Sequence, residues 1–328
     1  MRTTDSDTGF FNRRTVLVTG ARGFIGRHVC NELLRQGAIV HALSRTEQPC
    51  DGVLNWHLAD CSHPTAAVDL VSQIQPDVVF HLAGYVNGGR DAQHVMPSLQ
   101  ANCLATVNLL LAVTKLQNCR LVLANSLEEP DTSEVETAPC SPYAASKFAS
   151  TIYARMFHAL YGTHVAITRI AMGYGPGQWD LKKLIPYVIL SLLQRKAPDL
   201  SSGKRRCDWV YIKDVVHGML LAASSPCCAG KTIDLASGTL TSLRTVVLHI
   251  VDLLGSTVTP NFGALPDRQL ERLRPADIET TKTLTGWEPS TSLRAGLAAT
   301  IEWYRSQFEE ETYERKGVLS CDQYQHLH

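Results

Sequence analysis

The chain has 328 residues, 45% of them hydrophobic and 19% charged, which is usual for a soluble globular protein of one or two domains. Its 31 basic and 31 acidic side chains balance, which argues against nucleic acid or a membrane surface as a partner. The ten cysteines lack metal-ligand spacing, so we expect no metal site and a cytoplasmic protein with reduced thiols. Residues 1–13 are predicted to be a disordered lead-in.

Short β-rich segments alternate with helical segments through the first half of the chain. Strands are predicted at 15–19, 39–43, 53–58, 78–83, 121–125 and 165–170, and helices at 24–36, 64–74, 97–116 and 142–161. Several strands are almost continuously apolar, which is typical of parallel strands buried on both faces. The pattern predicts an α/β fold, with a doubly wound parallel Rossmann sheet over residues 14–170 and ligands at the carboxyl ends of its strands.

The pattern loosens beyond residue 170. Helices are predicted at 181–195, 212–224, 242–254 and 292–307, among short strands and turns. We interpret residues 171–308 as a smaller α/β C-terminal lobe that supplies substrate contacts, with the chain crossing back to the first domain. Residues 309–328 are predicted to be a flexible tail.

A glycine-rich turn follows the first predicted strand and opens the first predicted helix. Its spacing, G-x-x-G-x-x-G, allows a tight turn, a close approach to phosphate and close packing of helix on strand. Backbone N–H groups at a helix N-terminus bind a pyrophosphate well, so the turn predicts a dinucleotide cofactor. The predicted contacts in this turn are Gly20, Arg22, Gly23, Phe24, Ile25 and Gly26.

The end of the second predicted strand favours NADP(H) over NAD(H). NAD sites usually place an acidic residue there to bind the ribose 2′-OH, but this chain has Ser44 and Arg45, with no acid before Glu47. Arg45 and Ser44 suit a 2′-phosphate, and Arg22 offers a second charge. Alternatively, Arg45 is a solvated surface residue and the cofactor is NAD.

Two further strand ends offer cofactor contacts. Asp60, followed by Cys61, lies after the third predicted strand and can accept from the adenine amino group. Leu82, Ala83 and Gly84 close the fourth, where we expect the backbone to pass close to the cofactor.

The start of the helix at 142–161 carries a candidate catalytic pair. Ser141 is a suitable N-cap and Pro142 suits the first helical position, so Tyr143 and Lys147 share one helix face. A nearby ammonium lowers the pKa of a phenol, which makes Tyr143 a plausible general acid/base for alcohol–ketone interconversion. Ser126 closes the fifth predicted strand and can hold the substrate oxygen.

Together these motifs resemble the extended short-chain dehydrogenase/reductase family, which includes nucleotide-sugar epimerases, dehydratases and ketoreductases. The motifs that carry the resemblance are residues 19–26, 81–84, 174–177, 208–214 and 286–289, with Asn102, Ser126, Tyr143 and Lys147. The resemblance implies catalysis by Ser126, Tyr143 and Lys147, with Asn102 supporting the proton path of the lysine. It also suggests a homodimer formed through the helices at 97–116 and 142–161.

The chain departs from the family pattern where the substrate's nucleotide diphosphate is normally bound. Met172 replaces a usual Asn, and Cys207 replaces a usual Arg, although Arg206 stands beside it and Arg274 is retained. A nucleotide sugar is the favoured substrate, and a non-sugar ketone is an alternative. The predicted substrate contacts are Tyr85, Met172, Lys183, Arg206 and Arg274.

The residues after Ser126 bear on the type of reaction. Leu127 removes one acid that dehydratases carry, and Glu128 stands where the dehydratase base would be, or is a solvated loop carboxylate. We therefore favour reduction of a 4-keto-6-deoxy sugar nucleotide by hydride transfer, with Tyr143 as proton donor. The alternatives are an epimerase or dehydratase with tightly held NAD, and a cofactor-sensing protein without catalysis.

Overall fold

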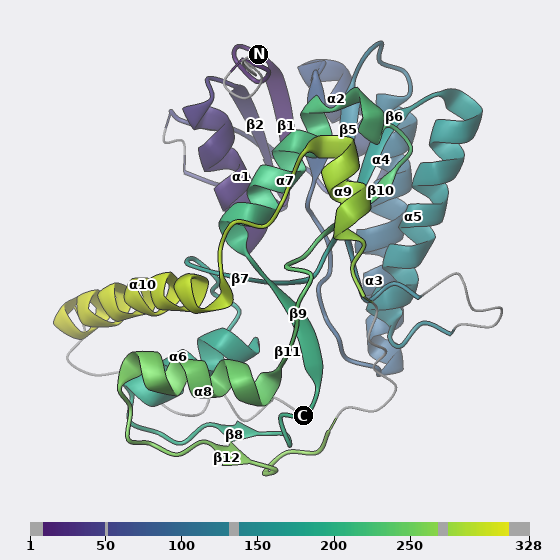
Figure 1. The fold of residues 1–328 in the computed structure, drawn as a ribbon. Helices are drawn as coiled ribbons and strands as arrows, with labels where there is room; N and C mark the ends of the chain where they lie inside the picture. The colour runs from purple at the N-terminus through teal and green to yellow at the C-terminus, as the bar shows by residue number, and fades with distance from the viewer. Residues whose placement is uncertain (1–8, 50–51, 131–137, 268–274, 315–328) are drawn as a thin grey trace, which may run out of the picture. The chain divides into compact units, whose positions relative to one another are not determined.

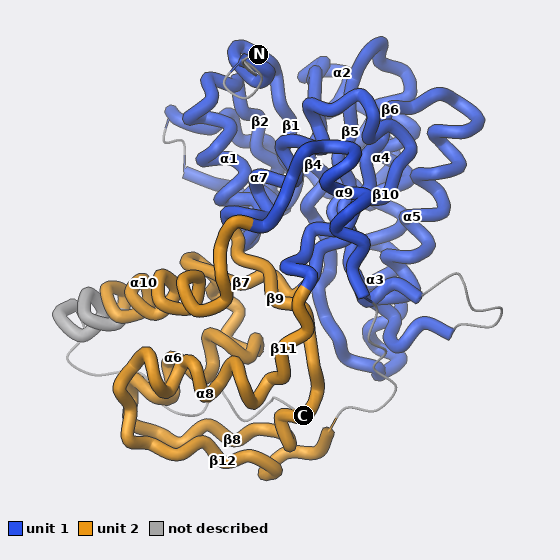
Figure 2. Tube along the Cα trace, in the orientation of Figure 1, with its two compact units in different colours: residues 1–171, 213–238, 274–289 blue, residues 172–212, 239–273, 290–328 orange. Residues whose placement is uncertain are grey.

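The computed structural model describes residues 9–49, 52–130, 138–267 and 275–314. The chain forms two compact units (Figure 2). Unit 1 comprises residues 1–171, 213–238 and 274–289, and unit 2 comprises residues 172–212, 239–273 and 290–328. The chain therefore returns to unit 1 twice after its first 171 residues.

Unit 1 is built on a seven-stranded parallel sheet with the order β10-β6-β5-β4-β1-β2-β3 (Figure 1). The strands are β1 (Thr15–Thr19), β2 (Ile39–Ser44), β3 (Asn55–Leu58), β4 (Val78–His81), β5 (Arg120–Ser126), β6 (His164–Ile170) and β10 (Thr232–Leu235). The strand order reverses between β1 and β4, which is where ligands bind on such sheets. The predicted doubly wound α/β fold is confirmed.

Helices cover both faces of this sheet. Helices α2 (Pro64–Ile74), α4 (Ala105–Val113) and α5 (Pro142–Tyr161) pack on one another over one face, and α1 (Phe24–Arg35) and α7 (Ile212–Ser224) cover the other (Figure 1). Helix α9 (Ile278–Thr285) packs beside β10. The apolar strands fill the core between these layers; Leu17, Val79 and Leu121 are fully buried.

The predicted helix at 97–116 is not continuous. The 3₁₀ turn η1 (Ala92–His94) and the short α3 (Val95–Ser98) lead into a π-helical segment, η2 (Leu99–Leu104), before α4 begins. Wider helical turns of this kind occur often at functional sites, and this one carries Asn102. By length and composition, residues 92–113 could cross a membrane, but half of the apolar window is buried inside the protein, as in core helices of soluble proteins.

The described residues of unit 2 form two small sheets and three helices. Strands β7 (Met172–Tyr174), β9 (Arg206–Tyr211) and β11 (Leu240–Ser242) form one sheet, and β8 (Asp199–Leu200) pairs with β12 (Asn261–Phe262). The helices, which pack on one another, are α6 (Leu184–Leu193), α8 (Leu243–Leu254) and α10 (Leu293–Glu314).

The predicted disordered lead-in and the predicted flexible tail both contain residues with defined structure. Phe11 lies inside the expected lead-in but is 2% exposed and contacts the ring of Phe80, and the N–H of Arg13 donates to Gly37 O. Helix α10 continues to Glu314, beyond residue 308. In each case apolar packing or helix continuation outweighs the polar composition that suggested disorder; residues 1–8 and 315–328 lie outside the described residues.

Candidate active site

The glycine-rich turn after β1 leaves no room for a side chain at Gly20 or Gly26. Gly20 has φ +69°, and a Cβ there would lie 2.6 Å from the backbone nitrogen of Ala83. A Cβ on Gly26 would clash with the carbonyl oxygen of Gly20. Gly23 is the N-cap of α1 and donates its N–H to Gly20 O at 2.8 Å. The turn thus presents bare backbone and a helix N-terminus, an arrangement that fits a pyrophosphate.

The Thr19–His81 pair locks this turn to the end of β4. Thr19 Oγ1 lies 2.7 Å from His81 Nδ1 and accepts from the N–H groups of Leu82 and Ala83. Burial, with a contribution from the charge of Lys147, lowers the pKa of His81 to about 3, so the ring is neutral. The sequence predicted Leu82 and Ala83 as backbone contacts of the cofactor but did not predict the Thr19–His81 bond.

The end of β2 carries a polar cluster at the position that distinguishes the two dinucleotides. Arg22 donates to Thr46 Oγ1 at 2.9 Å, and Ser44 Oγ accepts from the Thr46 N–H at 3.1 Å. Burial acts to raise the pKa of Asp60, but hydrogen bonds from Ser62 and the charge of Arg45 lower it overall. Arg22 and Ser44 therefore meet at Thr46, and Arg45 lies close enough to Asp60 for its charge to lower the pKa of that carboxyl.

A side chain of α4 holds the segment that follows β3. Asp60 accepts from the N–H of Ser62 at 2.9 Å, and Asn108 donates to the carbonyl oxygen of Cys61 at 2.9 Å. Burial raises the pKa of the Cys61 thiol to about 12, so it is an inert packing group rather than a reactive one.

The start of α5 follows the predicted capping. Ser141 Oγ accepts from the N–H of Ala144 at 3.1 Å, and Pro142 occupies the first turn. This fixes Tyr143 where its hydroxyl bonds with Ser126 at the end of β5. The structure thus brings together the strand-end serine and the helix-start tyrosine, which are 17 positions apart in the sequence.

The pKa of Tyr143 shifts in the direction opposite to the sequence-based expectation. Burial raises it, and so do the negative charges of Glu128 and Glu129, while the bond with Ser126 lowers it by less. The expectation considered only Lys147 and omitted the two carboxylates and the surrounding protein. Tyr143 therefore keeps its proton at neutral pH and can donate it.

Lys147 is buried one turn further along α5. Its Nζ donates to the carbonyl oxygen of Ala124 on β5 at 2.7 Å. Burial lowers its pKa to about 8, with Glu129 acting in the opposite direction. A Cβ on Gly84 would lie 3.6 Å from this Nζ, so the bare backbone after β4 passes beside the ammonium group.

Asn102 ties η2 to the loop after β4. Its side chain accepts from the Tyr85 N–H at 2.7 Å and donates to the Tyr85 carbonyl oxygen at 3.1 Å and to Ser146 Oγ at 2.9 Å. It therefore reaches the helix of Lys147 through Ser146. The Tyr85 hydroxyl lies 2.9 Å from His94 Nδ1, which sequence reasoning did not identify as part of the site.

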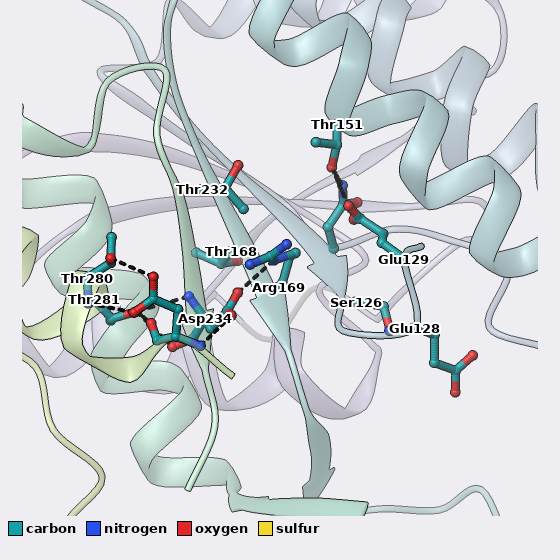
Figure 3. A network of polar contacts seen from close by, with 12 residues as sticks. Ser126, Glu128, Glu129, Thr151, Thr168, Arg169, Thr232, Asp234, Thr280 and Thr281 are labelled. Atoms are coloured by element: carbon teal, nitrogen blue, oxygen red, sulfur yellow. Dashed lines mark hydrogen bonds and ion pairs between the residues drawn. The ribbon is translucent and has the colours of Figure 1, made fainter. Parts of the chain in front are cut away.

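The two carboxylates after Ser126 have different environments. Glu128 is half-buried, and its N–H donates to Ser126 Oγ at 3.1 Å. Glu129 is 4% exposed, and its carboxylate points to Thr151 on α5, away from Glu128 (Figure 3). Sequence reasoning selected Glu128 and missed Glu129, whose burial follows from the turn that ends β5.

The remaining predicted contacts lie in unit 2 or outside the described residues. Met172 begins β7 and is half-buried, Lys183 is the N-cap of α6, and Arg206 is exposed on β9, donating to Leu240 O at 2.8 Å. Arg274 lies outside the described residues. Among the residues that are described, no group of three or more His, Cys, Asp or Glu side chains is placed to hold a metal ion.

Comparison with known proteins assigns the fold and site to a family. A model of the NAD dependent epimerase/dehydratase family matches residues 16–234. The chain is 28% identical to UDP-glucose 4-epimerase of Mycolicibacterium smegmatis, covering 89% of this chain and 98% of that one. It is also 28% identical to dTDP-glucose 4,6-dehydratase 1 of Escherichia coli K12, covering 89% and 92%.

Solved structures share the fold. A UDP-glucose 4-epimerase from Thermotoga maritima with UDP-glucose has a TM-score of 0.81 at 23% identity, covering 90% of this chain and 99% of that one. MoeE5 in complex with UDP-glucuronic acid and NAD has a TM-score of 0.78 at 29% identity, covering 89% and 99%. The chain belongs to the NAD-dependent epimerase/dehydratase family, the extended short-chain dehydrogenase/reductase group that its motifs resemble.

Proposed function

We propose that this protein is an NADP(H)-dependent reductase of a keto group on a nucleotide-linked sugar. The observation that carries the proposal is the neutral Tyr143 phenol, bonded to Ser126 and kept protonated by burial and by the charges of Glu128 and Glu129. Reduction of a carbonyl needs such a donor, because the new alkoxide must take up a proton. A bound nicotinamide cofactor would supply the hydride.

The residues of unit 1 divide the chemical work among them. Ser126 would hold the carbonyl oxygen while Tyr143 delivers its proton to it. The buried Lys147 ammonium stabilises negative charge as it develops on the phenol. Asn102 holds the backbone of Tyr85 and the hydroxyl of Ser146, which keeps the loop after β4 against α5.

The cofactor preference rests on the polar cluster at the end of β2. Arg22, Ser44 and Arg45 offer two positive charges and a hydroxyl, with no acid at the end of the strand. That set suits a 2′-phosphate and would leave the 2′-OH of NAD without its usual acceptor. We therefore favour NADP(H), although solved members of the family are described with NAD or NADH.

Nucleotide sugars are the favoured substrates because of the chain's relatives. The relatives named above are described as acting on UDP-glucose or dTDP-glucose, and MoeE5 was solved with UDP-glucuronic acid. Lys183 and Arg206 are the described cations of unit 2 that we propose as diphosphate contacts.

A second candidate is an epimerase that retains its oxidised cofactor. The epimerases among its relatives favour it. The two functions differ in stoichiometry, because a reductase consumes one reduced cofactor per product and an epimerase consumes none. The test is to purify the protein, read the spectrum of any retained nicotinamide, and then add NADPH with UDP-, GDP-, CDP- and dTDP-linked 4-keto sugars. Net loss of NADPH supports the reductase; retained NAD⁺ without NADPH loss opposes it.

A homodimer is also proposed, through an exposed apolar face on α5 and the adjoining η2 and α4 segments. Large apolar side chains there are 41–67% exposed. A contiguous exposed apolar face of this kind favours burial against a protein partner. These side chains are Leu99, Leu104, Leu111, Ile152, Tyr153, Leu160 and Tyr161. Sedimentation of the wild type and of Leu160→Glu tests this: the wild type should be a dimer and the variant a monomer.

A further inference from the structure

A row of polar side chains crosses three parallel strands of unit 1 in register. Asp234 on β10 pairs with Arg169 on β6, and Arg169 pairs with Asn125 on β5. Directly paired residues of neighbouring strands project from the same face of the sheet. Arg169 Nε donates to Asp234 Oδ1 at 2.6 Å (Figure 3). Asp234 Oδ2 accepts from the N–H of Asp277 at 2.8 Å. The Arg169 charge thus has Asp234 as its direct partner.

Helix α5 continues this row to Glu129. Asn125 Nδ2 donates to Thr151 Oγ1 at 2.5 Å and to the carbonyl oxygen of Lys147 at 3.1 Å. The Thr151 hydroxyl in turn lies 3.0 Å from both carboxylate oxygens of Glu129 (Figure 3). Because Glu129 is 4% exposed, its charge is anchored inside the protein and little screened by water.

The charges around Glu129 alternate in sign. Burial raises the pKa of Glu129 to about 7, opposed by the Thr151 bond and the charges of Arg169 on β6 and Lys147 on α5. Burial lowers the pKa of Lys147 to about 8, opposed by Glu129. Tyr143 and His81, which also interact with this pair, are neutral. The order Asp234, Arg169, Glu129, Lys147 therefore runs negative, positive, negative, positive.

We propose that Glu129 is a positioning residue. Its carboxylate, bonded to Thr151 one helical turn beyond Lys147 on α5, keeps the ammonium group of Lys147 charged. A buried ammonium needs an opposite charge to stay protonated. Asp234 bonds directly to Arg169, whereas Glu129 is the carboxylate whose charge favours the charged form of Lys147. The inference rests on the proposed function only in that Lys147 assists a phenol proton donor.

The effect of Glu129→Gln on the ionisation of Lys147 should depend on pH. Well below pH 7 Glu129 is itself protonated, so Glu129→Gln should behave like the wild type. Above pH 7 the wild type gains the negative charge and the variant does not, so Lys147 loses its proton at a lower pH in the variant. A residue that only filled space would instead affect the protein equally at every pH.

The direct test is a carbon-13 NMR titration of the Lys147 side chain in the full chain, without substrate, with the signal assigned by Lys147→Met. Glu129→Gln should lower the Lys147 midpoint by about one pH unit, which is a tenfold change in its ionisation constant. Glu288→Gln removes a carboxylate from an exposed ion pair with Lys282 and should leave the midpoint unchanged. An unchanged midpoint in Glu129→Gln would overturn the proposal.

Thr151→Val provides a second variant if Glu129→Gln does not fold. It keeps the carboxylate but removes its hydroxyl donor, so Glu129 should ionise at higher pH and the Lys147 midpoint should fall by a smaller amount. An unchanged midpoint there would count equally against the proposal. Because this readout needs no turnover, it is independent of whether the protein is a reductase. Where activity is measurable, wild-type and Glu129→Gln rates should nearly coincide near pH 6 and differ by about fivefold near pH 8.

Discussion

Asn102 holds the backbone of Tyr85 from both sides, accepting from its N–H at 2.7 Å and donating to its carbonyl oxygen at 3.1 Å. The π-helical turn of η2 makes this possible, because it places a buried amide side chain opposite the loop that follows β4. The same amide reaches Ser146 on α5. One side chain thus joins the proposed cofactor-facing loop to the catalytic helix.

Asn102→Ala should destabilise the protein and loosen that loop. It leaves the N–H and carbonyl of Tyr85 without this partner, and an unsatisfied buried polar group costs about 1–3 kcal/mol. Urea unfolding should show a loss of this size. Asn102→Asp keeps the acceptor for the Tyr85 N–H but loses both donors, so it should retain part of the stability. Wild-type stability in Asn102→Ala would contradict the assigned role.

Tyr143→Phe should abolish turnover and leave cofactor affinity almost unchanged. The substitution removes only the hydroxyl that bonds with Ser126. Loss of a general acid typically lowers the rate by about 10²- to 10⁴-fold. Steady-state rates and fluorescence titration with NADPH measure the two effects separately. Substantial remaining turnover would remove Tyr143 from the mechanism.

Arg45→Gln should weaken binding of NADPH and spare NADH. A hydrogen bond to a charged group contributes about 1.5–3 kcal/mol, so the Kd for NADPH should rise at least about tenfold. Arg22→Gln should act in the same direction, because Arg22 belongs to the same cluster with Ser44. Calorimetry with both cofactors provides the comparison. Equal losses for NADPH and NADH would show that Arg45 does not read the 2′-phosphate.

The lowered pKa of His81 should make the folded protein less stable at acidic pH. Its pKa is lowered from 6.5 to about 3 in the folded protein, so the unfolded chain binds a proton first as the pH falls. Stability from this group is complete above about pH 6.5 and declines toward pH 3, by at most about 1.4 kcal/mol per pH unit. Urea unfolding of the wild type and His81→Gln across this range tests the point. The variant should show a flatter decline, and parallel curves would contradict the prediction.

Much of unit 1 is predictable from local patterns in the sequence. The strand at 15–19 and the helices at 64–74 and 142–161 match the structure to the residue. Apolar periodicity marks all three, a proline begins each helix, and a glycine ends the helix at 142–161. The strand at 232–235 was missed. It joins the sheet beside β6 after a long excursion of the chain, and four residues that include Asp234 carry no signal for such a distant partner.

The site residues also divide into those that local motifs predict and those that depend on distant contacts. Motif spacing located Ser126, Tyr143 and Lys147, whose positions follow from one strand end and one helix start. The Thr19–His81 bond and the burial of Glu129 depend on strands and turns that meet only in the folded chain. The predicted direction of the Tyr143 pKa shift was wrong for that reason, because burial and the charges of Glu128 and Glu129 raise the pKa and spacing alone shows neither.

The central claim, net hydride transfer to a substrate carbonyl, is tested most directly by isotope tracing. The protein should be incubated with NADPH carrying deuterium at the transferable nicotinamide position and a 4-keto sugar nucleotide, and the product analysed by mass spectrometry and proton NMR. We predict one deuterium per product molecule, bonded to the former carbonyl carbon. A sugar product with inverted configuration and no deuterium would contradict the account.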